Sequence, residues 1–186
     1  MAKYDGWTYG ETEALLNKIG GVDVAREVLR GKKNLVVKDG LSAIEGVVLV
    51  KTLNLKPSKA QSLMEVVARG NYDDYNTDII YKMFFEDGVG FDEPVSINLV
   101  RFDRKLDYSK MIAWAKENGV KPMQAKHLFA IGIQFPYEQL STMIVEIGTS
   151  VRGDALCLHG SEDRRCLSRY TVGGSWAPSH LFGFLA

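Results

Sequence analysis

Apolar residues recur at intervals of three and four in several stretches of the chain, the spacing that places them on one face of an α-helix. In the clearest case, Ser58 and Gln61 have the spacing of a capping box, and apolar positions then continue at helical intervals to Gly70. Asp107 and Gly119 bracket a second amphipathic segment as an N-cap and a C-terminal glycine. The pattern predicts helices over residues 9–19, 22–30, 58–70, 108–118 and 122–131.

Elsewhere apolar and polar positions alternate, which is the period of a half-buried β-strand. Val95, Ile97 and Leu99 show this alternation most clearly. A turn-forming cluster at 160–163 separates two strand-like runs and predicts a β-hairpin. We expect strands over residues 34–38, 44–53, 95–99, 142–147, 154–159, 164–172 and 180–185, whereas 79–85 fits a short helix or a strand and 71–78 and 86–93 read as loops.

These elements predict one α+β domain over residues 1–186. It has a helical front (9–31), a mixed middle (34–131) and a β-rich C-terminal part (142–185) that completes an antiparallel sheet. No repeat or Pro/Gly-rich linker divides the sequence.

The composition narrows the possible partners. The 186 residues carry 23 Lys and Arg against 23 Asp and Glu, so no net charge attracts the chain to nucleic acid or to an anionic membrane. No run approaches the roughly 20 apolar residues of a membrane-spanning helix, and the first residues lack the apolar core of a signal peptide. Two cysteines cannot form a disulfide scaffold. We therefore expect a cytoplasmic protein without a cofactor.

Several short strings resemble a known family. They are Leu-Asn-Lys-Ile-Gly-Gly at 16–21, Leu-Arg-Gly at 29–31, Gly-Ser-Trp at 174–176 and Phe-Gly-Phe at 182–184. They are similar to strings in a family of uncharacterised proteins from candidate-phylum bacteria with small genomes. The resemblance implies a small bacterial cytoplasmic protein. Because that family has no assigned chemistry, the resemblance carries over no site residue.

Four residues of the C-terminal part have side chains that can do chemistry. Cys157, His159, Cys166 and His180 are of the types that bind zinc, and a hairpin turn at 161–162 would place Cys157 opposite Cys166. Their spacing lacks the paired cysteine knuckle of structural zinc sites. The alternatives to a zinc site are a reversible disulfide between Cys157 and Cys166 and ordinary packing of the two cysteine side chains. A nucleophilic cysteine with a histidine base, using Cys157, His159 and Cys166, is the corresponding enzyme hypothesis.

Basic residues form small clusters, of which Arg164, Arg165 and Arg169 lie near the aromatic residues Tyr170 and Trp176. Arginines beside aromatic rings can bind single-stranded nucleic acid. However, Glu162 and Asp163 precede this cluster, and acidic residues also interrupt the others, so a solvated face is the favoured interpretation.

The main hypothesis is a small binding protein that recognises another protein or a second copy of itself. Trp176 in a Gly- and Pro-flanked loop, together with Phe182 and Phe184, would form the contact surface, with the apolar strand 180–185 as an exposed edge or a subunit seam. An enzyme using the Cys/His set and a nucleic-acid-binding module are the two alternatives.

Overall fold

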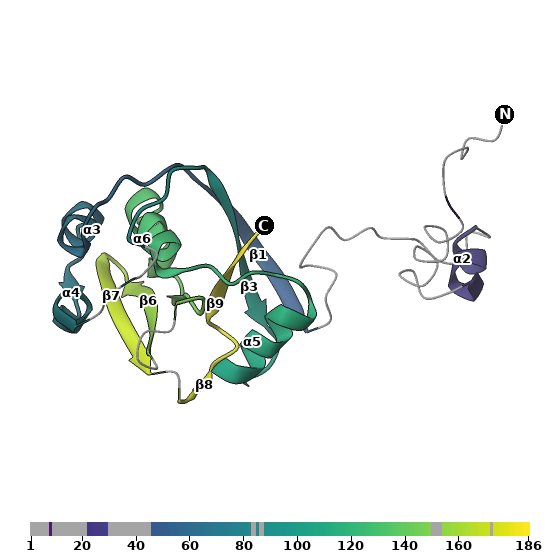
Figure 1. The fold of residues 1–186 in the computed structure, drawn as a ribbon. Coiled ribbons are helices and arrows are strands. Elements are labelled where there is room, and N and C mark those ends of the chain that lie inside the picture. Colours follow the sequence, from purple (N-terminus) through teal and green to yellow (C-terminus); the bar gives the residue numbers. More distant parts are fainter. Residues whose placement is uncertain are drawn as a thin grey trace. The chain divides into compact units, whose positions relative to one another are not determined.

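The computed structural model describes residue 8 and residues 22–29, 46–82, 85, 88–149, 154–171 and 173–186. The chain divides between Lys38 and Asp39 into two compact units, which are described separately. In the first unit, helix α2 spans Val22–Leu29 (Figure 1) and confirms the helix predicted over 22–30. The predicted helix over 9–19 and strand over 34–38 lie outside the described residues.

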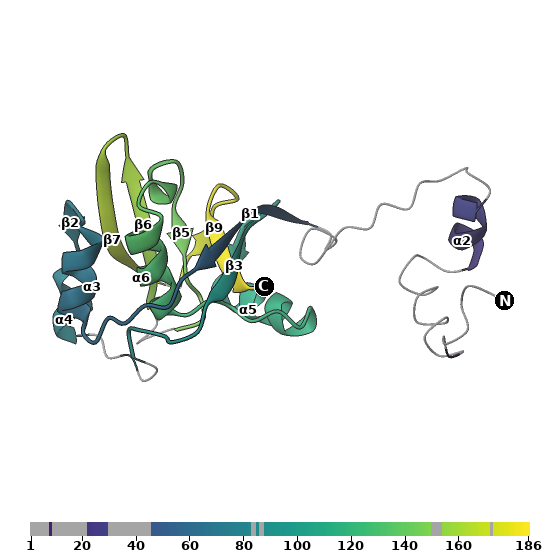
Figure 2. The ribbon, with the colours of Figure 1, turned by 90° about the horizontal axis from the view of Figure 1, so that it is seen from above.

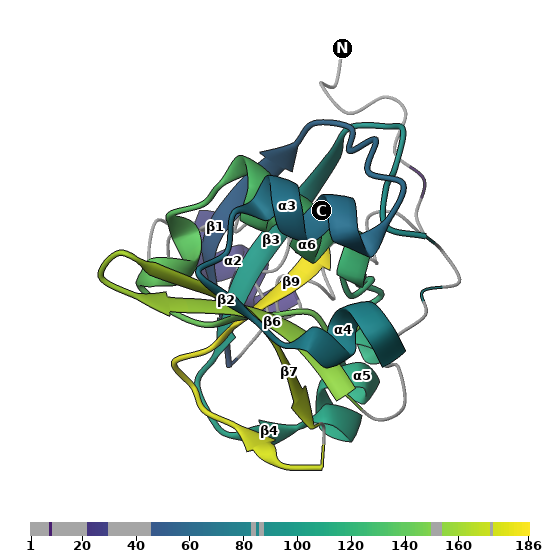
Figure 3. The ribbon, with the colours of Figure 1, turned by 90° about the vertical axis from the view of Figure 1, so that its left-hand side faces the viewer.

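The second unit is built on a seven-stranded sheet with the order β1-β3-β9-β5-β6-β7-β2. Neighbouring strands are antiparallel except for the pairs β5–β9 and β2–β7, which are parallel. The strands are β1 (Val47–Leu55), β2 (Asp74–Tyr75), β3 (Val95–Phe102), β5 (Ile144–Val145), β6 (Asp154–Ser161), β7 (Arg164–Thr171) and β9 (Leu181–Leu185). Strands β4 (Leu106–Asp107) and β8 (Ser175–Trp176) form a second, small sheet, at the bottom of Figure 3.

Helices accompany this sheet, and the predicted α+β class is confirmed. They are α3 (Leu63–Gly70), α4 (Thr77–Lys82), α5 (Tyr108–Glu117), α6 (Ala125–Gln134) and the 3-10 turn η2 (Glu138–Leu140). Figures 1 and 2 show α3 and α4 near β7, and α5 near β3 and β9. The segment 79–85, which fitted a helix or a strand, begins within helix α4.

Two apolar cores stabilise the second unit. Leu128, Phe129 and Ile131 of α6 pack in one core with residues of α3, β1 and β3. Met111 and Ala115 of α5 pack in the other core with residues of β3, β8 and β9. Because Leu156 and Leu158 of β6 belong to the first core and Ala155 and Cys157 to the second, the two cores lie on opposite faces of the sheet.

The capping box predicted at Ser58 is wrong by four residues. The backbone of Ser58 exchanges two 2.9 Å hydrogen bonds with the backbone of Phe91, which holds this segment extended. Helix α3 instead begins after Ser62, whose side chain accepts a hydrogen bond from the Glu65 N–H at 3.2 Å, while the Glu65 carboxylate accepts one from the Gln61 N–H at 2.8 Å. A tertiary contact therefore decided which of two similar local signals starts the helix.

The predicted exposed edge at 180–185 is also wrong. Strand β9 lies in the middle of the sheet, between β3 and β5, and the edges are β1 and β2. The hairpin 154–171 is confirmed, but its turn lies at 162–163, so Cys157 faces Ser168 and His159 faces Cys166. The expected opposition of Cys157 and Cys166 is therefore replaced by a diagonal arrangement.

Candidate functional site

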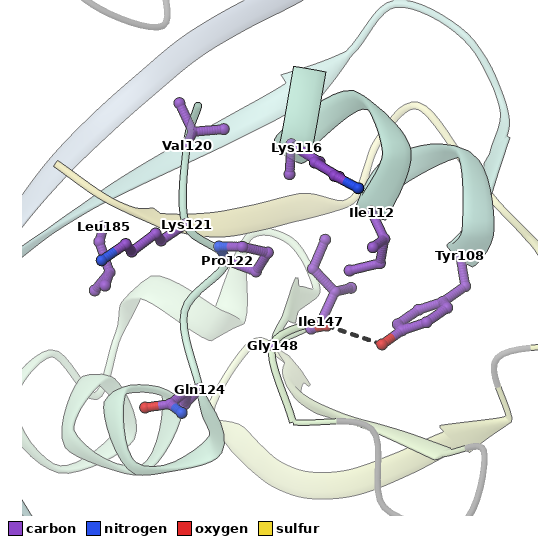
Figure 4. A pocket seen from close by; sticks show the side chains of 11 residues that line it. Tyr108, Ile112, Lys116, Val120, Lys121, Pro122, Gln124, Ile147, Gly148 and Leu185 are labelled. Atoms are coloured by element: carbon purple, nitrogen blue, oxygen red, sulfur yellow. Dashed lines mark hydrogen bonds between the residues drawn. The ribbon is translucent and has the colours of Figure 1, made fainter. Parts of the chain in front are cut away.

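A groove of about 490 Å³ opens in the second unit between helix α5, the segment after it, the turn after β5 and the end of β9 (Figure 4). Among the described residues, most of its lining is apolar, with two lysines and no carboxylate. The lining residues are Tyr108, Ile112, Ala115, Lys116, Val120, Lys121, Pro122, Gln124, Ile147, Gly148 and Leu185. It is the candidate site because it combines an apolar interior with charges of a single sign.

Helix α5 supplies one wall. Tyr108, Ile112 and Ala115 lie at positions i, i+4 and i+7, so they share one face of the helix. The Asp107 side chain accepts a hydrogen bond from the Lys110 N–H at 2.8 Å and fixes the start of the helix. Backbone and side-chain hydrogen bonds at the helix start lower the pKa of Asp107 to about 2, so this cap remains charged under ordinary conditions.

The segment after α5 forms the second wall. Gly119, with φ of +65°, turns the chain at the end of the helix, as its position in the sequence predicted. The carbonyl of Lys121 then accepts a hydrogen bond from the Leu185 N–H at 2.8 Å, and the Met123 N–H donates to the Gly183 carbonyl at 2.9 Å. These bonds hold residues 121–123 along β9. The helix predicted from Pro122 therefore begins later, at Ala125.

The turn after β5 forms the third wall and is bonded to the other two. The Tyr108 hydroxyl donates to the Ile147 carbonyl at 3.2 Å, the dashed line in Figure 4. The Gly148 N–H donates to the Met123 carbonyl at 3.0 Å, and a Cβ on Gly148 would lie only 2.4 Å from that carbonyl oxygen. Backbone contacts therefore preform the groove. The backbone at residue 148 lies so close to the Met123 carbonyl that this position requires glycine, which has no Cβ.

Lys116 and Lys121 provide the charge of the groove. Both side chains are exposed, and within the part of the chain that the structure describes neither forms an ion pair. Ile112 and Ile147 face each other in the interior between the walls (Figure 4). This arrangement can accept an apolar side chain and place carboxylates near the two ammonium groups.

Glu146 lies behind the third wall and is completely buried. Its Oε2 accepts a hydrogen bond from the Thr149 N–H at 2.9 Å, and its Oε1 accepts one from the Leu156 N–H at 3.2 Å. Burial raises the pKa of Glu146 to about 8, although the hydrogen bonds it accepts from backbone N–H groups favour the charged form. The carboxylate therefore titrates near neutral pH.

Three of the four predicted Cys/His residues share one face of the sheet, whereas His180 precedes β9 and packs against Trp176. Cys157 and His159 on β6 share that face with Cys166 on β7, as register and strand alternation require. Both cysteines are buried, and burial raises the pKa of Cys157 to about 12, which disfavours the thiolate that a nucleophile needs. The His159 Nε2 lies 2.9 Å from the Ser168 hydroxyl. No three His, Cys, Asp or Glu side chains among the described residues are grouped so as to hold a metal ion.

The three aromatic residues predicted to contact a partner lie in the core. Trp176 is 2% exposed, Phe182 1% and Phe184 0%, so none presents a contact surface. The Trp176 ring packs edge-on against both Phe182 and His180 with centroids 5.9 Å apart. Their burial follows from the central position of β9 and from the pairing of β8 with β4 over the second core.

The three arginines predicted as a nucleic-acid patch are engaged within the protein. Arg164 forms an ion pair with Asp74 at 3.3 Å, and Arg169 forms ion pairs with Asp78 at 3.2 Å and with Asp154 at 3.3 Å. The Arg165 guanidinium donates hydrogen bonds to backbone carbonyls of α3, α6 and the turn after α6. Arg164 and Arg169 are therefore paired with carboxylates, and the Arg165 guanidinium is bonded to backbone carbonyls. The three arginines do not form a free basic surface.

No family model, curated protein or solved structure matches this chain. Among the described residues, no helix has the length and apolar character needed to cross a membrane.

The sequence pattern predicts elements that carry part of the groove, but it does not predict the groove itself. The amphipathic face predicted for 108–118 contains Tyr108 and Ile112, and Ile147 ends a predicted strand. No sequence pattern marks Lys116 and Lys121 as site residues, because neither belongs to a motif or a cluster of basic residues. Glu146 carried a usable signal, since it is a carboxylate between the apolar residues Val145 and Ile147.

Proposed function

We propose that this chain is a small cytoplasmic binding protein that recognises an acidic segment of a protein partner through the groove between α5, residues 120–124 and the turn after β5. The segment would place one aliphatic side chain against Ile112 and flanking carboxylates at Lys116 and Lys121. The observation that carries the proposal is the lining itself, which is apolar inside and, among the residues that the structure describes, has two lysines and no carboxylate.

Two features of the groove support a binding role. Its walls are joined by hydrogen bonds, so little conformational entropy is lost when a ligand enters. The two lysines form no ion pair among the described residues, so a ligand carboxylate would not have to displace an internal one. The alternatives lose support, since the cysteines are buried and the arginines of β7 are engaged.

The test uses a fluorescein-labelled acidic probe peptide with the sequence Asp-Glu-Leu-Glu-Asp and two matched peptides. One replaces the carboxylates with amides (Asn-Gln-Leu-Gln-Asn), and the other replaces the leucine with glycine. We expect the acidic probe to bind with a Kd below about 1 mM, with NMR shift changes at residues of the groove. Both matched peptides should bind more weakly, and added salt should weaken the acidic probe.

Charge-reversal variants locate the binding surface. The double variant Lys116→Glu with Lys121→Glu should weaken the acidic probe by about tenfold or more. The control reverses two other exposed lysines, Lys59 and Lys105, to glutamate and gives the same net charge. Equal weakening by both double variants, or no binding of the acidic probe to the natural chain, contradicts the proposal.

A further inference from the structure

Glu146 is a buried carboxylate directly behind a wall of the groove. It is 0% exposed, and it immediately precedes Ile147 and Gly148, which line the groove. Among the described residues, no cation lowers its pKa, and the groups that stabilise its charge are backbone N–H groups. A buried charge without a counter-ion is costly, so such a residue needs a structural or functional reason.

The carboxylate organises the turn that forms the wall. It accepts hydrogen bonds from the N–H groups of Thr149 at 2.9 Å and Leu156 at 3.2 Å, while the Gly148 N–H bonds to the Met123 carbonyl at 3.0 Å. Thr149 in turn accepts a hydrogen bond from the Ala125 N–H at 3.1 Å, which ties the turn to the start of α6. The position of the groove wall is therefore coupled to the Glu146 side chain.

Among the described residues, few charged groups belong to the elements packed against this turn. From α6, to whose start the turn is bonded, they are Lys126 and His127, and burial lowers the pKa of His127 to about 4. From β6, the Cys157 thiol is close enough to interact with Glu146, and the raised pKa of that thiol, about 12, keeps it neutral below pH 10. Asp154, at the start of β6, is paired with Arg169. From α5, the Tyr108 hydroxyl bonds to the Ile147 carbonyl rather than to Glu146. Lys116 and Lys121 are the cations of the groove itself.

We propose that Glu146 is a positioning residue through which protonation regulates the groove, so that an acidic segment binds more tightly when this carboxyl group carries a proton. Loss of the proton places behind the wall that the acidic segment contacts a negative charge that no cation among the described residues compensates. In a poorly solvated interior that charge opposes a second negative charge more strongly than it would in water. This inference rests on the proposed function. Linkage also requires the ligand to favour the proton on Glu146 by the same factor.

Burial raises the pKa of Glu146 to about 8, which places the change in affinity between neutral and mildly alkaline pH. The acidic probe should therefore bind the natural chain about fivefold more weakly at pH 9 than at pH 6.5. The amide-substituted peptide should show a much smaller change, because it carries no charge for Glu146 to oppose.

The first experiment compares these affinities in the natural chain and in Glu146→Gln. The variant should bind the acidic probe with the same affinity at both pH values, and it also controls for titration of the groove lysines. A pH profile that the variant shares with the natural chain overturns the role of Glu146. Failure of the probe to bind the natural chain at pH 6.5 overturns the proposed function as well, so the two failures are distinct.

A second experiment needs no variant. Calorimetric titration of the natural chain with the acidic probe at pH 8, in two buffers of different ionisation enthalpy, measures the protons taken up on binding. We expect net uptake of a fraction of one proton. Binding without proton uptake would contradict the coupling even if Glu146→Gln failed to fold.

Discussion

Arg165 and Arg164 are neighbours in the sequence, but the structure predicts very different consequences when each is replaced. The Arg165 side chain donates to the carbonyls of Pro136 at 2.9 Å, Gly70 at 2.7 Å and Gly132 at 2.5 Å. Its guanidinium also lies 5.3 Å from the centre of the Tyr72 ring. One side chain therefore joins the ends of two helices to β7.

Replacing Arg165 with methionine keeps much of the aliphatic stem and removes these three hydrogen bonds and a fourth, 3.4 Å long, to the Asn71 carbonyl. Each partly buried carbonyl that loses its donor costs about 1–3 kcal/mol, and water can satisfy part of this loss. We therefore expect Arg165→Met to lower the free energy of unfolding by about 4 kcal/mol. Arg164 forms a single ion pair with Asp74, and the two side chains are 61% and 62% exposed. Arg164→Met should change stability by less than about 0.5 kcal/mol.

Urea unfolding followed by tryptophan fluorescence measures both variants under the same conditions. If the free energies of unfolding of the two variants differ by less than about 1 kcal/mol, Arg165 does not stabilise the protein by joining α3 and α6 to β7. The nucleic-acid hypothesis makes the opposite prediction, since both variants would then weaken salt-sensitive RNA binding without changing stability. A filter-binding titration with single-stranded RNA tests that outcome directly.

Three further predictions concern other parts of the second unit. The pKa of Glu146 is raised from 4.5 to about 8. The stability that its protonated carboxyl group contributes to the fold is therefore fully present below pH 4.5 and is lost as the pH rises through 8. The free energy of unfolding should fall by about 2.5 kcal/mol between pH 6 and pH 9. Urea unfolding at both pH values should show this slope in the natural chain and a flatter one in Glu146→Gln. Gly148→Ala should destabilise the protein by about 1–3 kcal/mol and weaken the acidic probe, because the new Cβ would lie 2.4 Å from a backbone carbonyl oxygen. Gly174→Ala is its control, since nothing lies within 4 Å of that position. Ser62→Ala should cost about 1 kcal/mol in thermal or urea unfolding, and an equal or larger loss in Ser58→Ala would contradict the observed cap.

The sequence by itself determined the fold class and many of the local elements. The helical spacing of Tyr108, Met111 and Ala115 and the cap at Asp107 predicted α5 correctly. The alternation of Val95, Ile97 and Leu99 predicted β3, and the turn-forming cluster after β6 predicted the hairpin. These features depend on residues a few positions apart, so backbone geometry and periodicity suffice to reveal them.

Tertiary structure decided where those elements lie and which residues they expose. The apolar run 180–185 fits an edge strand or a central strand equally well, and only its pairing with β3 and β5 buries Phe182 and Phe184. Arg164 and Arg165 have the same local sequence signal, but strand alternation and the position of α6 expose one and bury the hydrogen bonds of the other.

The groove has the same origin. Ile112, Lys121 and Ile147 come from three separate segments, and no local pattern relates them. They meet because residues 121–123 bond to β9 and Gly148 approaches the Met123 carbonyl. Periodicity reports which face of an element is apolar, whereas the partner of that face depends on how distant segments share the available buried surface.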